Sequence, residues 1–297
     1  MISKKNAVCF GEILWDVFID DKKVGGAPLN LALRMQSFGI NTSIVSQLGN
    51  DSLGIALKHF IEKRNVSTQL ISITQNYPTS EVKVSLNKKG IAEYVIEYPC
   101  AWDKIQNNSS IEKAVINSDL FIYGSLASRD EVSRKTLMSL INISKFNAFD
   151  VNLRPPHYEI SIIKELMHKA DFIKLNEEEL ELISRDLGSK NKTLNDNIKF
   201  ISIKTDTKMI CVSKGEKGAV LYINGIYYSQ DGFKVKVIDT VGSGDSFLAA
   251  LLTGVLNKQP FDLVLKKACA IGALVASESG ANPIIEENYL NKFIESQ

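Results

Sequence analysis

Apolar positions along the chain follow two patterns, short strand-like runs and longer stretches with helical spacing. Residues 7–10 form an apolar run typical of a buried strand, and residues 30–38 carry apolar side chains on one face of a helix that Gly39 ends. Further strands are predicted at 44–48, 119–124, 146–150, 172–175 and 209–212, and helices at 53–64, 134–143, from 177 onward and at 268–276. Strands that alternate with helices predict an α/β fold with a doubly wound, mostly parallel sheet.

One stretch interrupts this alternation. Residues 79–86 and 91–98 both alternate apolar and polar side chains, and the polar residues 87–90, which include a glycine, join them. This pattern predicts a β-hairpin. The hairpin has two readings: it belongs to a small sheet outside the main one, or it lies at the edge of the main sheet.

The stretch 233–256 changes from strand-like to helical spacing at a glycine-rich turn. Alternation of Phe233, Val235 and Val237 with lysines predicts a strand, and the apolar positions after residues 242–245 predict a helix. The first N–H groups of such a helix point outward, unpaired, at the positive end of its dipole. The turn is therefore predicted to bind an anion.

Asp245 adds a negative charge at the turn where an anion is expected to bind. A carboxylate there is either an ordinary helix cap or a base that accepts the proton of an attacking hydroxyl. Two other phosphate-binding loops are excluded, because no Lys follows Gly244 as in a Walker A loop and the third glycine of a dinucleotide fingerprint is missing. Phosphoryl transfer is a chemistry that uses both the amides and the acid.

Polar residues also follow other predicted strands. Asp16 is either a turn acid or a ligand at the carboxyl edge of the sheet, and the pair Gly25-Gly26 lets the backbone approach a ligand closely. Two prolines follow Arg154 and prevent a helix there, so Arg154 lies on a loop. It is either a solvated charge or a phosphate ligand. Glu179, in the first turn of a predicted helix, serves either the helix dipole or a metal ion.

Length and charge narrow the class of protein. A chain of 297 residues with 44% hydrophobic side chains can bury a substantial core in one large domain or two small ones. The net charge of +1, from 35 basic and 34 acidic residues, gives no field that would recruit nucleic acid or an anionic membrane. We therefore expect a small-molecule partner, with no nucleic acid and no membrane.

The cysteines and the lengths of the apolar runs point to the compartment. The four cysteines contain no C-x-x-C pair, which argues against a zinc site and against a secreted disulfide framework. No apolar run approaches the ~20 residues of a membrane span, and the run at 7–10 is too short for a signal peptide. We expect a cytoplasmic protein.

Residues 239–245 read D-T-V-G-S-G-D and resemble the D-T-x-G-A-G-D signature of the ribokinase-like (PfkB) carbohydrate kinases. The sequence departs from that signature at Ser243, where alanine is usual, but the side chain is still small and its amide stays available. The resemblance implies that Asp245 is the catalytic base. It also implies that the amides of Gly242, Ser243 and Gly244 form the anion hole.

Further runs resemble the same family, and within it the bacterial fructokinases. G-E-x-x-x-D and G-G-A-P-x-N-x-A occur within the first 32 residues, and D-V-N-L-R-P at 150–155 implies that Arg154 binds substrate or the γ-phosphate. The A-W-D run at 101–103 leaves Trp102 either as hinge packing or as a substrate contact. The residues that the N-terminal runs assign to the sugar are Asp16, Gly25, Gly26 and Asn30.

The resemblance also implies sites for nucleotide and metal. The N-x-x-E of Asn176 and Glu179 matches a motif that organises Mg²⁺ and phosphate through waters, and Asp239 matches a position near a monovalent cation, K⁺, in some members. The residues assigned to ATP are Asn176, Ser213, Gly215, Gly244 and Asn282.

The implied organisation is a single ribokinase-like α/β kinase domain over 1–297, with a small β lid formed by about 12–24 and 79–99. In several members such lids pair two subunits into a homodimer. The implied activity is ATP-dependent phosphorylation of a sugar primary hydroxyl. The first choice is a fructokinase, which converts D-fructose and ATP to D-fructose 6-phosphate and ADP. The alternatives are ribokinase, 2-keto-3-deoxygluconate kinase, nucleoside kinase and a catalytically silent sugar-binding relative.

Overall fold

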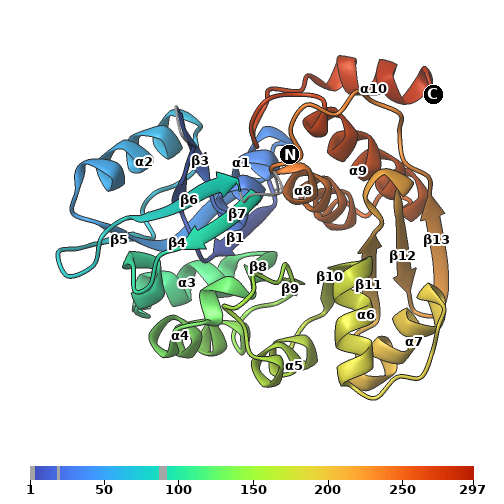
Figure 1. The fold of residues 1–297 in the computed structure, drawn as a ribbon, viewed down its shortest axis with the longest axis horizontal. Coiled ribbons are helices and arrows are strands. Elements are labelled where there is room, and N and C mark those ends of the chain that lie inside the picture. Colours follow the sequence, from blue (N-terminus) through green and yellow to red (C-terminus); the bar gives the residue numbers. More distant parts are fainter. Residues whose placement is uncertain (1–3, 19–20, 87–91) are drawn as a thin grey trace.

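The computed structural model describes residues 4–18, 21–86 and 92–297, and in this part of the chain most strands belong to one nine-stranded sheet (Figure 1). Its strands are β1 (Asn6–Phe10), β4 (Asn41–Gly49), β5 (Ile71–Thr74), β8 (Leu120–Gly124), β9 (Asn147–Asp150), β10 (Phe172–Asn176), β11 (Met209–Ser213), β12 (Ala219–Ile223) and β13 (Ile226–Gln230). The strand order is β13-β12-β11-β10-β9-β8-β1-β4-β5.

The sheet is parallel from β5 to β11, and β12 and β13 add an antiparallel edge. From β1 the chain first proceeds to β4 and β5 on one side, and it then crosses to β8 on the other side of β1. The strand order therefore reverses between β1 and β8. In open α/β sheets, ligands bind outside the carboxyl ends of the strands at such a switch point.

Helices cover both faces of this sheet (Figure 1). Alternate residues of β1 point to opposite faces: Ala7 and Cys9 join one apolar cluster, and Val8 and Phe10 join the other. The first cluster packs against α1 (Ala27–Ser37), α2 (Ser52–Lys63), α8 (Ser243–Leu256), α9 (Phe261–Ala276) and α10 (Glu287–Glu295). The second packs against α3 (Ser109–Asn117), α4 (Glu131–Ile141), α5 (Ile160–His168), α6 (Glu177–Asp186) and α7 (Leu194–Thr205). The predicted doubly wound α/β fold is confirmed.

A second, four-stranded sheet lies beside the first. Its order is β3-β2-β6-β7, with strands β2 (Leu14–Val17), β3 (Lys22–Gly25), β6 (Ser80–Leu86) and β7 (Ala92–Ile96). The antiparallel pair β6 and β7 confirms the predicted hairpin, and the reading that placed it at the edge of the main sheet is wrong. The predicted loop 87–90 lies outside the described residues. The lid bounds of about 12–24 and 79–99 stay a prediction.

A buried ion pair holds the base of the small sheet. Arg129 donates to both carboxylate oxygens of Asp103, at 2.7 and 2.8 Å, and to the carbonyl of Glu97 at 2.6 Å, just beyond β7. Its guanidinium lies 4.2 Å from the ring centroid of Trp102, which is fully buried. Its full burial favours a packing role for Trp102 over a substrate contact. Removing one partner of such a pair leaves a buried charge without compensation, so the pair fixes where the small sheet starts.

Three details of the fold differ from the sequence predictions. The strand predicted at 233–237 is wrong, because this segment is an irregular loop in which Phe233 packs on Phe293 while Val237 is exposed. The β12–β13 hairpin was not predicted. Helix α1 begins at Ala27, so Asn30 lies inside the helix, because proline is tolerated in a first helical turn.

A search of the described residues for a helix with the length and apolar character of a membrane span found none.

Candidate active site

The carboxyl ends of five parallel strands converge at one edge of the main sheet. Because adjacent strands are in register, Gly124 of β8 faces Asp150 of β9, Asp150 faces Lys174 of β10, and Asn176 faces Ser213 of β11. Glu12 follows β1 at the same edge and is buried. This edge of the sheet at the switch point, called the crevice below, therefore contains the acids Glu12 and Asp150 and the lysine Lys174.

The glycine-rich turn meets this edge at the start of α8. Gly242 is the residue before the first helical turn, with φ 75°, and a side chain there would collide with the backbone of Ala281. The N–H of Ser243 donates to the carbonyl of Thr240 at 3.2 Å, and its hydroxyl donates to the carbonyl of Gly272 at 2.9 Å. Of the three predicted anion-hole amides, that of Ser243 is thus the one that already has a partner.

The other amides of the turn are available. Among the described residues, the N–H groups of Gly242, Gly244 and Asp245 have no hydrogen-bond partner. These N–H groups lie at the positive end of the α8 dipole, and Gly244 is exposed. These donors could bind an anion at the place that the sequence predicts, with the amide of Asp245 as an additional donor.

Asp245 is the third residue of α8, and its side chain caps no helix N–H. Its Oδ2 atom accepts a hydrogen bond of 2.8 Å from Asn30 Nδ2, and no described residue donates to Oδ1. Burial raises the pKa of this carboxyl to about 6, while the Asn30 bond, Lys174 and Arg154 limit the rise. The carboxylate is therefore ionised at neutral pH, with one oxygen free to accept a proton.

A chain of amides holds this carboxylate. Asn282 Nδ2 donates to Asn30 Oδ1 at 2.7 Å, so Asn30 must present its NH₂ group to Asp245. Arg34, one turn further along α1, donates to the Ser246 hydroxyl at 3.1 Å and to the Pro283 carbonyl. Asn30, predicted to bind sugar, is thus also the residue that orients Asp245, and Asn282, predicted to bind nucleotide, contacts Asn30.

The predicted sugar residues gather on the small-sheet side. Gly25 pairs with Leu14 on β2 and β3, and a side chain at Gly25 would overlap the Asp16 carboxylate. Gly26 has φ 107°, and a side chain there would meet the Glu12 carbonyl. Burial raises the pKa of Asp16 to about 6, with Arg154 opposing and Asp245 adding to the rise. The charges of Asp16, Arg154 and Asp245 therefore act within one crevice.

Glu12 is a buried acid of the crevice that the sequence analysis did not assign. Burial raises its pKa to about 7, the Arg154 charge lowers it, and the charges of Asp245 and Asp150 add to the rise. Its Oε2 atom has no hydrogen-bond partner among the described residues. Glu12 is the glutamate of the G-E-x-x-x-D run, and its place in that run did not reveal that it is buried.

Glu179 serves the fold directly. In a reciprocal cap, its N–H donates to Asn176 Oδ1 at 2.8 Å, and its Oε2 accepts from the Asn176 N–H at 2.9 Å. Its Oε1 accepts from the Leu153 N–H at 2.8 Å, which anchors the loop that carries the exposed Arg154. Each carboxylate oxygen keeps a second acceptor position, so a role toward water and metal is compatible with this cap.

The residues present fit Mg²⁺ held through water. No group of three or more metal-binding side chains occurs in the part of the chain that the structure describes. Glu179 is a buried carboxylate at this edge, and each of its oxygens keeps an acceptor position for a water molecule. Mg²⁺ prefers one or two carboxylates plus waters and substrate phosphates over a full protein cage.

The remaining predicted residues are Ser213, Gly215 and Asp239. Ser213 donates from its hydroxyl to the Leu175 carbonyl at 3.4 Å, and Gly215, with φ 57°, faces open space. The Asp239 carboxylate accepts the N–H groups of Val241 and Gly280 and pairs with Lys23 Nζ at 3.4 Å. Among the described residues, no hydrogen bond joins Ser213 or Gly215 to Asp245.

Comparison with known proteins gives the family. The model of the pfkB family carbohydrate kinases matches residues 4–288. Fructokinase-2 of Solanum lycopersicum is 30% identical over 281 residues, which cover 89% of this chain and 84% of that protein.

Two solved structures share the fold. A fructokinase with bound ATP from Xylella fastidiosa has a TM-score of 0.87 at 22% identity and covers 99% of both chains. A double mutant of the fructokinase from Vibrio cholerae O395, in its fructose-, ADP- and potassium-bound form, has a TM-score of 0.85 at 21% identity, covering 98% of this chain and 99% of that one. With a family model that matches nearly its whole length and a ribokinase-like fold, this chain belongs to the pfkB family of carbohydrate kinases.

Proposed function

We propose that the protein transfers the γ-phosphoryl group of ATP to a primary hydroxyl of D-fructose, giving D-fructose 6-phosphate and ADP. The observation that carries this proposal is the pairing of Asp245, whose Oδ1 is free, with the unpaired amides of Gly242, Gly244 and Asp245 at the start of α8. Base and anion site lie within one helical turn. The fructokinase names of the relatives support fructose as the sugar.

The reaction follows from this geometry. The sugar binds between Asp16 and Asp245, and its primary hydroxyl gives its proton to Asp245 as the hydroxyl oxygen attacks the γ-phosphorus. The bond to the bridging oxygen breaks and ADP leaves with that oxygen. Donors already fixed at the N-terminus of α8 stabilise the charge of the transferring group without having to reorganise. Arg154 adds a positive charge from its exposed position on the loop after β9.

We propose Mg²⁺ as the divalent ion, held through waters by Glu179; bound there, it would neutralise charge on the ATP phosphates. We also propose K⁺ near Asp239, on the support of the potassium ion bound to the Vibrio cholerae fructokinase. Lys23 already pairs with Asp239, so its ammonium and a K⁺ ion would compete for this carboxylate. The cytoplasmic location stays a prediction.

Phosphorylation of a panel of sugars with ATP tests the function. We expect transfer to D-fructose, with ribose, 2-keto-3-deoxygluconate and nucleosides much slower, and the product identified as the 6-phosphate. Transfer to one of the other sugars instead would reassign the substrate within the family. Binding of fructose without transfer to any sugar would favour the silent binding protein.

Replacement of Asp16 tests the sugar site. Asp16→Ala removes a charged acceptor of sugar hydroxyls, worth ~1.5 to 3 kcal/mol, so the KM for fructose should rise about tenfold or more while the KM for ATP stays unchanged. Asp21→Ala is the matched control, because Asp21 is an exposed acid next to β3 in the same small sheet. An altered ATP KM with a normal fructose KM would refute the assignment.

We further propose a homodimer through the small sheet. Val95 of β7 is 56% exposed, although its neighbour Ile96 is buried against the body of the protein. A small sheet with one face uncovered gains stability when a second copy covers it. Light scattering over a range of concentrations should give the mass of two chains, and a monomer at every concentration would reject the dimer.

A further inference from the structure

Lys174 is a charged residue at a position that the strand pattern reserves for the core. It lies on β10 two residues after Phe172, so both side chains point to the face of the sheet that α8 covers. Its side chain is 8% exposed. Burying an ammonium group costs several kcal/mol unless a counter-charge or a ligand compensates for the loss of water. Lys174 is therefore not an ordinary structural residue of the sheet.

The compensation inside the protein is incomplete. The counter-charge is Asp150, directly opposite on β9, with Nζ and Oδ1 3.2 Å apart. Among the described residues, Lys174 Nζ makes no hydrogen bond of good geometry, and neither carboxylate oxygen of Asp150 accepts one. The three N–H groups of the Lys174 ammonium thus have only the ion pair with Asp150 as a partner among the described residues. Lys174 has donors available for a further anion.

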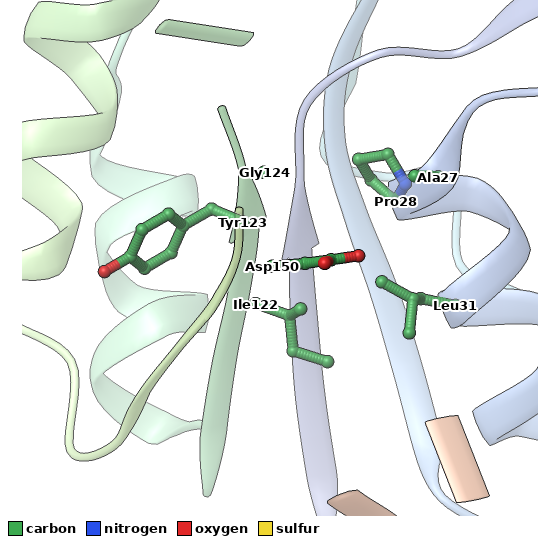
Figure 2. Close-up of a pocket in the computed structure, with 7 residues that line it drawn as sticks. All are labelled: Ala27, Pro28, Leu31, Ile122, Tyr123, Gly124 and Asp150. Carbon is green, nitrogen blue, oxygen red and sulfur yellow. The ribbon is translucent and has the colours of Figure 1, made fainter. Parts of the chain in front are cut away.

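Asp150 cannot find its partners elsewhere. Figure 2 shows its carboxylate pointing from the end of β9 toward Pro28 and Leu31 of α1. The small cavity there, of about 10 Å³, is otherwise lined by apolar groups and by backbone. It is at the lower limit for a single water molecule. The charge of Asp150 is therefore directed to Lys174.

The ammonium stays charged. Burial lowers the pKa of Lys174, but the carboxylates of Asp150, Glu179 and Asp245 outweigh burial and hold the pKa above its ordinary value. Because three acids share this positive charge, Lys174 attracts a phosphate more weakly than an unpaired ammonium would, but it offsets the repulsion between these acids and the phosphate.

Lys174 also faces the anion site. A methyl group built on Gly244 would lie 3.9 Å from Lys174 Nζ, and no other described atom outside the neighbouring residues and the backbone of α8 would come within 4 Å of it. Gly244 is exposed, and its N–H is unpaired. The space beside Gly244 thus has an amide donor on one side and an ammonium donor on the other.

We propose that Lys174 is a further catalytic residue that binds the γ-phosphoryl group during transfer, opposite the amides of α8, with Asp150 as the residue that positions its ammonium. The inference rests on the proposed kinase function. Lys174 moves no proton in this step: it donates hydrogen bonds to the equatorial oxygens of the transferring group while Asp245 takes the hydroxyl proton.

The test compares nucleotides that differ in the γ-phosphate. In Lys174→Met, the dissociation constant of the imido analogue of ATP should rise about tenfold, and that of ADP should stay within about twofold, measured by calorimetry with Mg²⁺. The kcat with fructose should fall by ~10² to 10³. Lys104→Met is the matched control, since Lys104 forms a partly buried ion pair with Asp130 at the base of the small sheet. This variant should change neither dissociation constant nor kcat.

A second variant guards against misfolding. Asp150→Asn combined with Lys174→Met removes both buried charges, so no carboxylate is left without compensation, and the same selective loss of the ATP analogue should appear. If the affinity of either folded variant, relative to wild type, changes by the same factor for the analogue and for ADP, the proposed role of Lys174 is overturned. The binding measurements contain no sugar, so an error about fructose leaves them intact, whereas a wild-type protein that binds neither nucleotide would overturn the kinase function itself.

Discussion

The hydrogen bond from Asn30 to Asp245 is the interaction on which the rest of the site depends. It joins α1, the first crossover of the fold, to α8, near the end of the chain, and Asn282 extends it to the loop after α9. Because the bond uses one carboxylate oxygen, it leaves the other free beside the amides of the helix. A base and an anion site that are fixed in this way need little reorganisation when charge develops.

The same edge of the sheet brings several charged side chains together, and most of them are buried or partly buried. Glu12, Asp16 and Asp245 all have a raised pKa, since burial disfavours their ionised forms; the charge of Asp245 adds to the rise at Glu12 and Asp16, and that of Asp150 adds to the rise at Asp245. Lys174 and Arg154 supply the opposing charge, the first rigid within the sheet and the second on an exposed loop. ATP would bring further negative charge to this edge, and the buried lysine offsets part of that charge.

The sequence predicted much of the fold, because strands such as residues 7–10 are buried on both faces and glycines stop the helices. The strand prediction failed at 233–237, where the alternating segment is a loop that packs through Phe233. The sequence analysis also missed the β12–β13 hairpin, although Asn224-Gly225 between two apolar runs is a hairpin signal. The glycine turn and Asp245 were predictable from a local pattern. Lys174 was not, because its meaning depends on Asp150 and Gly244, which lie at distant places in the chain.

The central claim is that Asp245 is a base and not a helix cap. The measurement that tests it most directly is the turnover of fructose and ATP by Asp245→Asn, with folding and ATP binding verified in the same protein. The amide keeps the size of the side chain and can still accept the bond from Asn30, but it cannot take a proton. The account predicts a fall in kcat of ~10² to 10⁴ with ATP binding preserved. A folded Asp245→Asn protein that turns over within a few-fold of wild type would contradict it.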